Sequence, residues 1–205
     1  MRSVHLAGLK FTMSIAPWRS PLARALHLNC SLAYARYLQL ATVREDGRPA
    51  NRTLVFRGFQ ADSDRLKFVA DSRSQKPEQI EHQPWAEACW YFPETREQFR
   101  LHGYLTLVKA DNPDAVLQQA RQTAWQETSD ATRLQFTWPD PGKPKADAAF
   151  EQAPPNAIEP LANFCLLLLN PVIVDRLELR GEPQNRTIYE WDEIQEIWTV
   201  QMVNP

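Results

Sequence analysis

The alternation of hydrophobic and polar positions predicts a chain built mostly from β-strands. Runs such as 37–43 and 98–108 alternate with a period of two and end at turn residues, as half-buried strands do. The strands predicted in this way are 37–43, 50–59, 66–70, 86–91, 98–108, 163–169, 172–179, 187–191 and 198–203. Hairpin connections between them, with few helices and few glycines, favour an antiparallel barrel.

Helical spacing of apolar residues interrupts the strand pattern in several places. The predicted helices cover about 20–32, 74–82, 111–126 and 128–135. Ser20 is the expected N-cap of the first helix, and Pro21 suits its first turn. Residues 139–160 hold six of the 16 prolines and are expected to form a Pro-rich loop. The predicted fold class is therefore mainly β with flanking helices (α+β), in a single domain over residues 1–205.

The charge balance argues against some classes of partner. The 205 residues include 23 Lys+Arg and 25 Asp+Glu, for a formal net charge of −2, so no broad cationic surface favours nucleic acid. The longest apolar run, at 164–169, is far shorter than the ~18–20 residues of a membrane helix. Basic residues also interrupt any apolar signal sequence near the N-terminus. We therefore expect a cytoplasmic protein with no membrane or nucleic-acid partner.

Most catalytic and metal-binding motifs are missing from the sequence. The six glycines form neither a GxGxxG motif nor a P-loop, which excludes a dinucleotide fold of the Rossmann type. The four histidines and three cysteines are scattered singly, so neither a metal site nor a disulfide framework is expected. If the protein performs chemistry, we infer that a bound cofactor supplies it.

One group of positive charges does indicate a ligand. If the strands 50–59 and 66–70 form a hairpin in which Phe59 faces Leu66, Arg52 falls opposite Arg73, within a residue or two. Two arginines that face each other repel, and an anion between them would remove this repulsion. The hairpin therefore predicts an anion site.

The residues that follow the hairpin add to the same charge. Ser74 is the expected N-cap of the next helix, whose first N–H groups and partial positive charge suit a phosphate. Lys76 brings a further cation. The sequence therefore predicts that these two residues join the two arginines in a phosphate site. In the alternative interpretation all of them are ordinary surface residues, and Asp71 neutralises one of the cations.

The same residues carry a resemblance to a known family, the pyridoxamine 5′-phosphate oxidase superfamily. The resembling segments are 40–49 (LATVREDGRP), 51–57 (NRTLVFR), 68–76 (FVADSRSQK), 92–103 (FPETREQFRLHG), 185–189 (NRTIY) and 198–205 (WTVQMVNP). Segment 71–76 and the string FTWPDPG at 136–142 are most similar to the oxidase-related FMN-binding branch of the superfamily.

The resemblance implies an FMN-binding split β-barrel that works as a homodimer with FMN at the subunit interface. It implies that Arg52, Ser74 and Lys76 hold the FMN phosphate with help from Arg73. The remaining contacts that it implies are the backbone of Thr53, Leu54 and Val55 along the isoalloxazine ring, Ala70 and Asp71 beside the ribityl chain, Gln98 at the polar end of the ring, and Arg186 and Trp138 reaching across from the partner subunit.

The chain departs from the family where the vitamin enzymes bind substrate. Pyridoxamine phosphate oxidases carry an Arg-x-His pair shortly before the position that Arg186 matches, and this chain has Glu182 and Gln184 there. A carboxylate repels a substrate phosphate. We therefore expect an FMN-dependent oxidoreductase with an unknown small-molecule substrate, which does not oxidise pyridoxine or pyridoxamine phosphate efficiently.

Other functions stay open at the level of the sequence. A non-catalytic flavin-binding or storage protein would show no sustained turnover with NADH or NADPH. A barrel for haem or a deazaflavin would differ in its visible absorbance. An OB-like nucleic-acid binder could stack bases on some of the seven tryptophans, but the chain has no basic stripe to accompany them.

Overall fold

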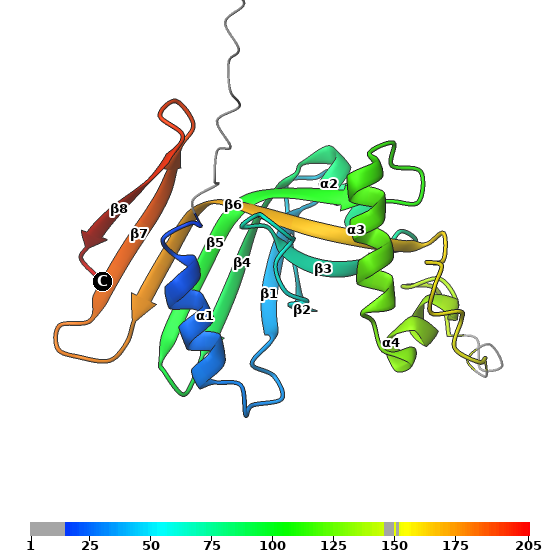
Figure 1. Cartoon of the computed structure of the whole chain (residues 1–205), viewed down its shortest axis with the longest axis horizontal. Helices are drawn as coiled ribbons and strands as arrows, with labels where there is room; N and C mark the ends of the chain where they lie inside the picture. The colour runs from blue at the N-terminus through cyan, green and yellow to red at the C-terminus, as the bar shows by residue number, and fades with distance from the viewer. Residues whose placement is uncertain (1–14, 146–149, 151) are drawn as a thin grey trace, which may run out of the picture.

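The computed structural model describes residues 15–145, 150 and 152–205. Its strands form one antiparallel sheet with helices around it, which confirms the predicted fold class (Figure 1). The elements in chain order are α1 (Arg19–Leu28), β1 (Tyr37–Val43), β2 (Pro49–Val55), β3 (Leu66–Asp71), α2 (Lys76–His82), β4 (Trp85–Phe92), β5 (Glu97–Val108), α3 (Ala115–Gln126), α4 (Asp130–Leu134), a 3-10 turn (Gln135–Thr137), β6 (Phe164–Glu178), β7 (Asn185–Asp192) and β8 (Ile197–Val203).

The sheet is organised around its two long strands. In the described part of the chain the strand order is β2-β1-β4-β5-β6-β7-β8, and β3 pairs with the first half of β6. One edge of β6 pairs with β5, and the other edge pairs first with β3 and then with β7. The sheet is therefore open, with β2 at one end and the β7–β8 hairpin at the other (Figure 1).

Strand β6 replaces two predicted strands. The sequence predicts a break between 163–169 and 172–179, but β6 continues through Pro171 with a shift of register opposite Gly103. A Cβ atom on Gly103 would lie 2.0 Å from the carbonyl oxygen of Asn170. The prediction of a break was wrong because the missing side chain on β5 gives β6 room to pass the proline without ending.

The apolar run at the start of β6 separates two hydrophobic cores. Residues 164–169 are all buried, and they alternate between the main core and a smaller core that Trp125 and Phe136 complete. A strand that is buried on both faces has apolar residues at consecutive positions, without the usual alternation with polar ones. The smaller core fastens α3 and the 3-10 turn to β3 and β6.

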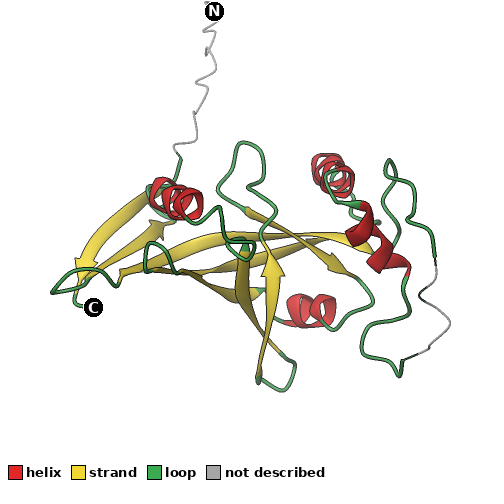
Figure 2. Ribbon diagram, turned by 90° about the horizontal axis from the view of Figure 1, so that it is seen from below, coloured by secondary structure: helices red, strands yellow, loops and turns green. Residues whose placement is uncertain are grey.

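Helix α1 is shorter than predicted. Its first residue is Arg19, and Ser20 lies inside the helix, so Ser20 is not the N-cap. The helix ends at Leu28 instead of continuing to residue 32, and Asn29 is its C-cap, whose side chain accepts a hydrogen bond from the backbone N–H of Glu94 (2.8 Å). Figure 2 shows α1 and α3 on one side of the long strands and α2 on the other.

The other helices lie where the sequence predicts them, with later starts. Helix α3 begins at Ala115, where the Asp114 carboxylate accepts hydrogen bonds from the first free N–H groups. The described residues of the Pro-rich segment 139–160 form neither helix nor strand, and 146–149 and 151 lie outside the described residues. Among the helices that the structure describes, none is long and apolar enough to cross a membrane.

Candidate cofactor site

The hairpin behind the predicted anion site exists only in part. Phe59 does face Leu66, but β2 then pairs with β1, while β3 pairs with β6. Arg52 therefore lies opposite Leu40, and the prediction that Arg52 faces Arg73 was wrong. The physical reason is that the alternating apolar residues of β3 are buried against β6, which draws β3 away from β2.

Arg52 nevertheless lies in a polar corner between β1, β2 and α2, where Thr42 and Gln79 surround its guanidinium. Its Nη1 donates to the backbone oxygen of Leu40 (3.1 Å) and to Thr42 Oγ1 (2.7 Å), and its Nη2 donates to Gln79 Oε1 (2.9 Å). Thr42 Oγ1 also donates to Gln79 Oε1 (2.6 Å). Burial, and then the charge of Arg44, lowers the pKa of Arg52. These bonds fix the guanidinium in one orientation, with other N–H donors unused.

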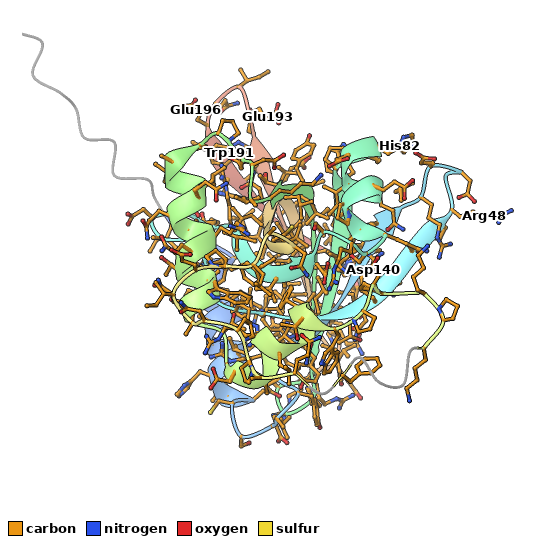
Figure 3. All side chains as sticks on the ribbon, turned by 90° about the vertical axis from the view of Figure 1, so that its right-hand side faces the viewer. Arg48, His82, Asp140, Trp191, Glu193 and Glu196 are labelled. Carbon is orange, nitrogen blue, oxygen red and sulfur yellow. The ribbon has the colours of Figure 1, made fainter. Side chains whose placement is uncertain are left out.

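Lys76 brings a second cation to this corner from the first turn of α2. Figure 3 shows α2, which ends at His82, beside the β1–β2 hairpin, whose turn carries Arg48. Among the described residues the Lys76 ammonium makes no hydrogen bond and no ion pair. Burial, and then the charge of Arg52, lowers the pKa of Lys76, while Asp71 acts in the opposite direction. The corner thus holds one anchored and one unpartnered cation.

Arg73 does not join these two cations. Its guanidinium forms an ion pair with Asp71 (2.7 Å), and it also donates to the backbone oxygens of Trp138 (2.9 Å) and Phe136 (3.2 Å). A further ion pair links it to Asp140 (3.2 Å). Hydrogen bonding to Asp71 raises the pKa of Arg73. Arg73 therefore ties the segment that follows α4 to the end of β3 and is not directed at the Arg52 corner.

Ser74 also has a different role from the predicted one. Its Oγ donates to the backbone oxygen of Asp71 (2.7 Å), and the position before α2 is Gln75, with no side-chain cap. The prediction of Ser74 as N-cap was wrong, because the chain turns at 72–74 before the helix begins.

The end of β3 forms one wall of the corner. Ala70 is buried there and faces Cys165 of β6. Burial alone would raise the pKa of Asp71, but hydrogen bonds from Arg73 and Asn163 hold it below its usual value. Burial raises the pKa of Cys165 to about 11, so its thiol stays neutral near pH 7. The wall therefore offers one carboxylate, already paired, and a small apolar surface.

Strand β2 presents free backbone groups at the edge of the sheet. In the antiparallel pair with β1, the N–H of Phe56 donates to the oxygen of Arg36 (2.8 Å). Hydrogen-bonded and non-hydrogen-bonded pairs alternate along an antiparallel ladder, so the backbone of Leu54, two residues before Phe56, also bonds to β1. The N–H and C=O groups of Thr53 and Val55 therefore point away from β1. β2 ends the sheet, so those groups are available to a ligand.

Two other predicted residues lie on a different face. Gln98 faces Leu177, which faces Arg186 on its other side, so all three share one face of the sheet. Successive strand pairs place Arg52 of β2 in line with Leu40 of β1, Ala88 of β4 and Leu101 of β5. Arg52 therefore shares the buried face of the sheet with Leu101, and Gln98 lies on the opposite face. Within one chain the structure therefore does not bring Gln98 and Arg186 to the Arg52 corner.

Sequence reasoning missed several residues of the site. Thr42 and Gln79 hold Arg52, and Asn163 holds Asp71. They come from distant elements and carry no charge, so no sequence pattern marks them. Arg57, just after β2, was also missed, and its buried Nε has no partner among the described residues.

The corner fits the phosphate of FMN, and the neighbouring strand edge fits its ring. A phosphate accepts hydrogen bonds in several directions and is attracted to neighbouring cations. Among the described residues neither Arg52 nor Lys76 forms an ion pair with a carboxylate, although the charge of Asp71 acts on Lys76. Free N–H and C=O groups on β2 match the alternating donors and acceptors along a flavin ring. Among the described residues no group of three or more metal-ligating side chains occurs.

Comparisons with known proteins agree with this fit. A family model described as "Pyridoxamine 5′-phosphate oxidase, FMN-binding domain" matches residues 15–109. Pyridoxine/pyridoxamine 5′-phosphate oxidase 2 from Arabidopsis thaliana is 39% identical over 197 residues, which cover 93% of this chain and 98% of that protein. The Pseudomonas syringae pyridoxine/pyridoxamine 5′-phosphate oxidase is 33% identical over 84 residues, or 41% of this chain and 38% of that protein.

Solved structures give the same result. A pyridoxamine 5′-phosphate oxidase-related, FMN-binding protein from Nostoc punctiforme is 62% identical, with a TM-score of 0.91 over 94% of this chain and all of that one. PhzG from Burkholderia lata shares the fold, with a TM-score of 0.76 at 18% identity over the full length of both chains. The chain belongs to the FMN-binding pyridoxamine 5′-phosphate oxidase family, with its split β-barrel fold, and FMN is its cofactor.

Proposed function

We propose that this protein is an FMN-dependent oxidoreductase that acts in the cytoplasm as a homodimer, with one domain over residues 1–205. The observation that carries the proposal is the pair of cations at the polar corner. Within the part of the chain that the structure describes, the Lys76 ammonium has no hydrogen-bond or ion-pair partner, and it lies near Arg52, which the surrounding hydrogen bonds hold in place. Such a pair is unfavourable until an anion neutralises it, and the FMN phosphate is that anion.

The proposed contacts with FMN follow the elements around this corner. Arg52 and Lys76 bind the phosphate, and Ser74 and Arg73 support it through Asp71. The other contacts are the outward backbone groups of Thr53 and Val55 along the ring, with Leu54 between them bonded to β1, Ala70 and Asp71 beside the ribityl chain, and Gln98, Trp138 and Arg186 at the ring. Bound FMN supplies the hydride or electron transfer, while the protein orients it and excludes water.

The homodimer is proposed because the contacts lie on two faces of one sheet. Gln98 and Arg186 face away from Arg52 within one chain, so a second copy has to bring them to the flavin. A shared ligand then stabilises the paired state. Sedimentation of the FMN-loaded protein at micromolar concentration should give a dimer, and a loaded monomer would contradict this arrangement.

The proposed substrate is a small molecule without a phosphate group. An open hollow of about 570 Å³ is lined by Arg96, Leu179, Gly181, Glu182, Pro183 and Gln184. By the resemblance, Glu182 and Gln184 stand where the vitamin enzymes carry Arg and His. The Glu182 carboxylate offsets the charge of Arg96, so the hollow lacks the net positive charge that would attract a phosphate. We therefore expect turnover of pyridoxine and pyridoxamine phosphates to fall well below ~1 per second, a typical lower value for enzymes.

A second candidate is oxidation of pyridoxine or pyridoxamine phosphate itself. It is favoured by the similarity to the Arabidopsis oxidase, which is 39% identical over 93% of this chain and 98% of that protein. The non-catalytic alternative, flavin storage, predicts no sustained turnover with any reductant.

One experiment separates these candidates. The FMN-loaded protein is assayed with both vitamin phosphates and, separately, for reduction by NADH and NADPH. The proposal expects slow vitamin turnover that rises in the double variant Glu182→Arg with Gln184→His, because a cation then replaces the carboxylate. Fast turnover by the unmodified protein supports the second candidate, and no reduction under any condition supports storage.

A further inference from the structure

A continuous row of ionisable side chains crosses the face of the sheet that carries Gln98. The row runs over β7, β6, β5 and β4, and its members in order are Arg186, Asp175, Arg100, Glu87 and His102. Each carboxylate in it lies between two basic side chains. The proposed function uses only the first member, Arg186, so the purpose of the others is not explained by it.

Asp175 is the central member of this row. Its side chain is only 7% exposed, although it faces the polar side of the sheet. Asp175 Oδ1 accepts from Arg186 Nε (3.0 Å), and Oδ2 accepts from Arg186 Nη2 (2.8 Å). Oδ2 also lies 3.5 Å from Arg100 Nη1. The two bonds to Arg186 are parallel and bidentate, the arrangement that fixes a guanidinium in both position and plane.

The strand register explains how this geometry arises. Asp175 lies directly opposite Arg100 on β5 and Ile188 on β7, and Arg186 lies two residues along β7 on the same face. The Arg186 side chain therefore has to lean back along its strand to reach Asp175. Nε and Nη2 are the nitrogens that bond to Asp175, and the donors on Nη1 make no hydrogen bond to any residue in the described ranges, so another acceptor can use them.

We propose that Asp175 is a positioning residue for the cofactor: it holds Arg186 in the one orientation in which its free N–H groups meet FMN. This inference rests on the proposed contact between Arg186 and FMN. Without the carboxylate, Arg186 loses its ion pair and regains its rotamer freedom, while Arg100 keeps its ion pair with Glu87 (2.5 Å), so binding the cofactor has to order Arg186 again. Loss of such supporting partners lowers the affinity of ligand sites about 10–100-fold in metal centres, which sets the scale expected here.

The test is a double-mutant cycle on FMN affinity. The FMN dissociation constants of the unmodified protein, Asp175→Asn, Arg186→Gln and the double variant are measured by quenching of flavin fluorescence. We expect each single change to weaken binding about tenfold. The double variant should bind no more weakly than Arg186→Gln alone, because Asp175 acts only through Arg186.

Two further variants keep the result interpretable. Glu178→Gln is the matched control, since Glu178 is another carboxylate of β6 paired with an arginine, Arg176, but it belongs to the opposite face. We expect its FMN affinity to stay within twofold of the unmodified protein. If Asp175→Asn fails to fold, Asp175→Glu keeps the charge and displaces it by one methylene, and it should weaken binding less than Arg186→Gln does.

The outcomes separate this inference from the proposed function. If Arg186→Gln weakens FMN binding and Asp175→Asn does not, or if the two effects add, the positioning role is overturned while the FMN contact stands. If neither change affects FMN binding, the inference fails together with the Arg186 contact. If the unmodified protein does not bind FMN, the proposed function itself fails.

Discussion

Replacing Lys76 by methionine should stabilise the FMN-free apoprotein against unfolding and lower its affinity for FMN. The Lys76 ammonium is partly buried, lacks any hydrogen bond among the described residues and lies near Arg52. Like charges at close range near a protein surface repel by a few kcal/mol, and Asp71 offsets part of this. Methionine keeps the apolar stem and removes the charge, so we expect a gain of about 1 kcal/mol in the unfolding free energy of the apoprotein. For a chain of this size that raises Tm by roughly 2–4 °C.

The same change removes a charge-assisted bond to the phosphate. Such bonds contribute about 1.5–3 kcal/mol, so the FMN dissociation constant should rise roughly 10- to 150-fold. Urea unfolding of the apoprotein followed by tryptophan fluorescence, together with FMN titration, measures both effects. Lys67→Met is the control, because Lys67 already has a partner in Glu127 (3.1 Å) and lies outside the corner. An apoprotein that loses stability while FMN affinity stays within twofold would refute the reasoning.

Three further predictions concern the same site and its support. FMN affinity should fall in alkaline solution as Lys76 loses its proton below its usual pKa of about 10.4, and Lys76→Arg, titrated in parallel, should remove this dependence. Gly103→Ala should prevent stable folding, because the new Cβ meets the Asn170 carbonyl at 2.0 Å. Gly47→Ala meets no atom within 4 Å and carries only the strain of a left-handed backbone (φ 78°), so it should lower Tm by a few degrees and leave the fold intact. The lowered pKa of Asp71 contributes stability above about pH 4 that is lost in more acidic solution, so Asp71→Asn should flatten the loss of unfolding free energy measured between about pH 6 and pH 3.

The strands were predictable because apolar residues recur at every second position along them and mark the buried face of each strand. β1 has the predicted bounds of 37–43, and β5 differs from its prediction by one residue. The break in β6 was not predictable, since the residue that removes it, Gly103, lies on another strand. Partner strands are chosen by tertiary packing, and for that reason the adjacent segments 50–59 and 66–70 do not form the long hairpin that their sequence separation favours.

The geometric argument for the predicted site was wrong, although two of the predicted residues do lie together. Arg52 and Lys76 do meet, but through β1 and α2 and not across a hairpin. Arg73 was selected by the hairpin register and by the resemblance, and neither shows its partners at 136–140, which are far away in sequence. Local charge patterns therefore identify which residues are unusual, whereas long-range packing decides which of them act together.

A stronger sequence signal for the site lies within β2 itself. Ala50 and Leu54 alternate with outward polar positions, so they mark the face of β2 that points into the protein, and Arg52 stands between them on that face. A charged side chain there loses hydration unless built-in partners replace it. The hydrogen bonds to Arg52 supply acceptors but no carboxylate, so its charge is held and not neutralised. A protein that holds an unneutralised cation at an inward position, with the unpartnered Lys76 beside it, is arranged for an anion that arrives from outside the chain.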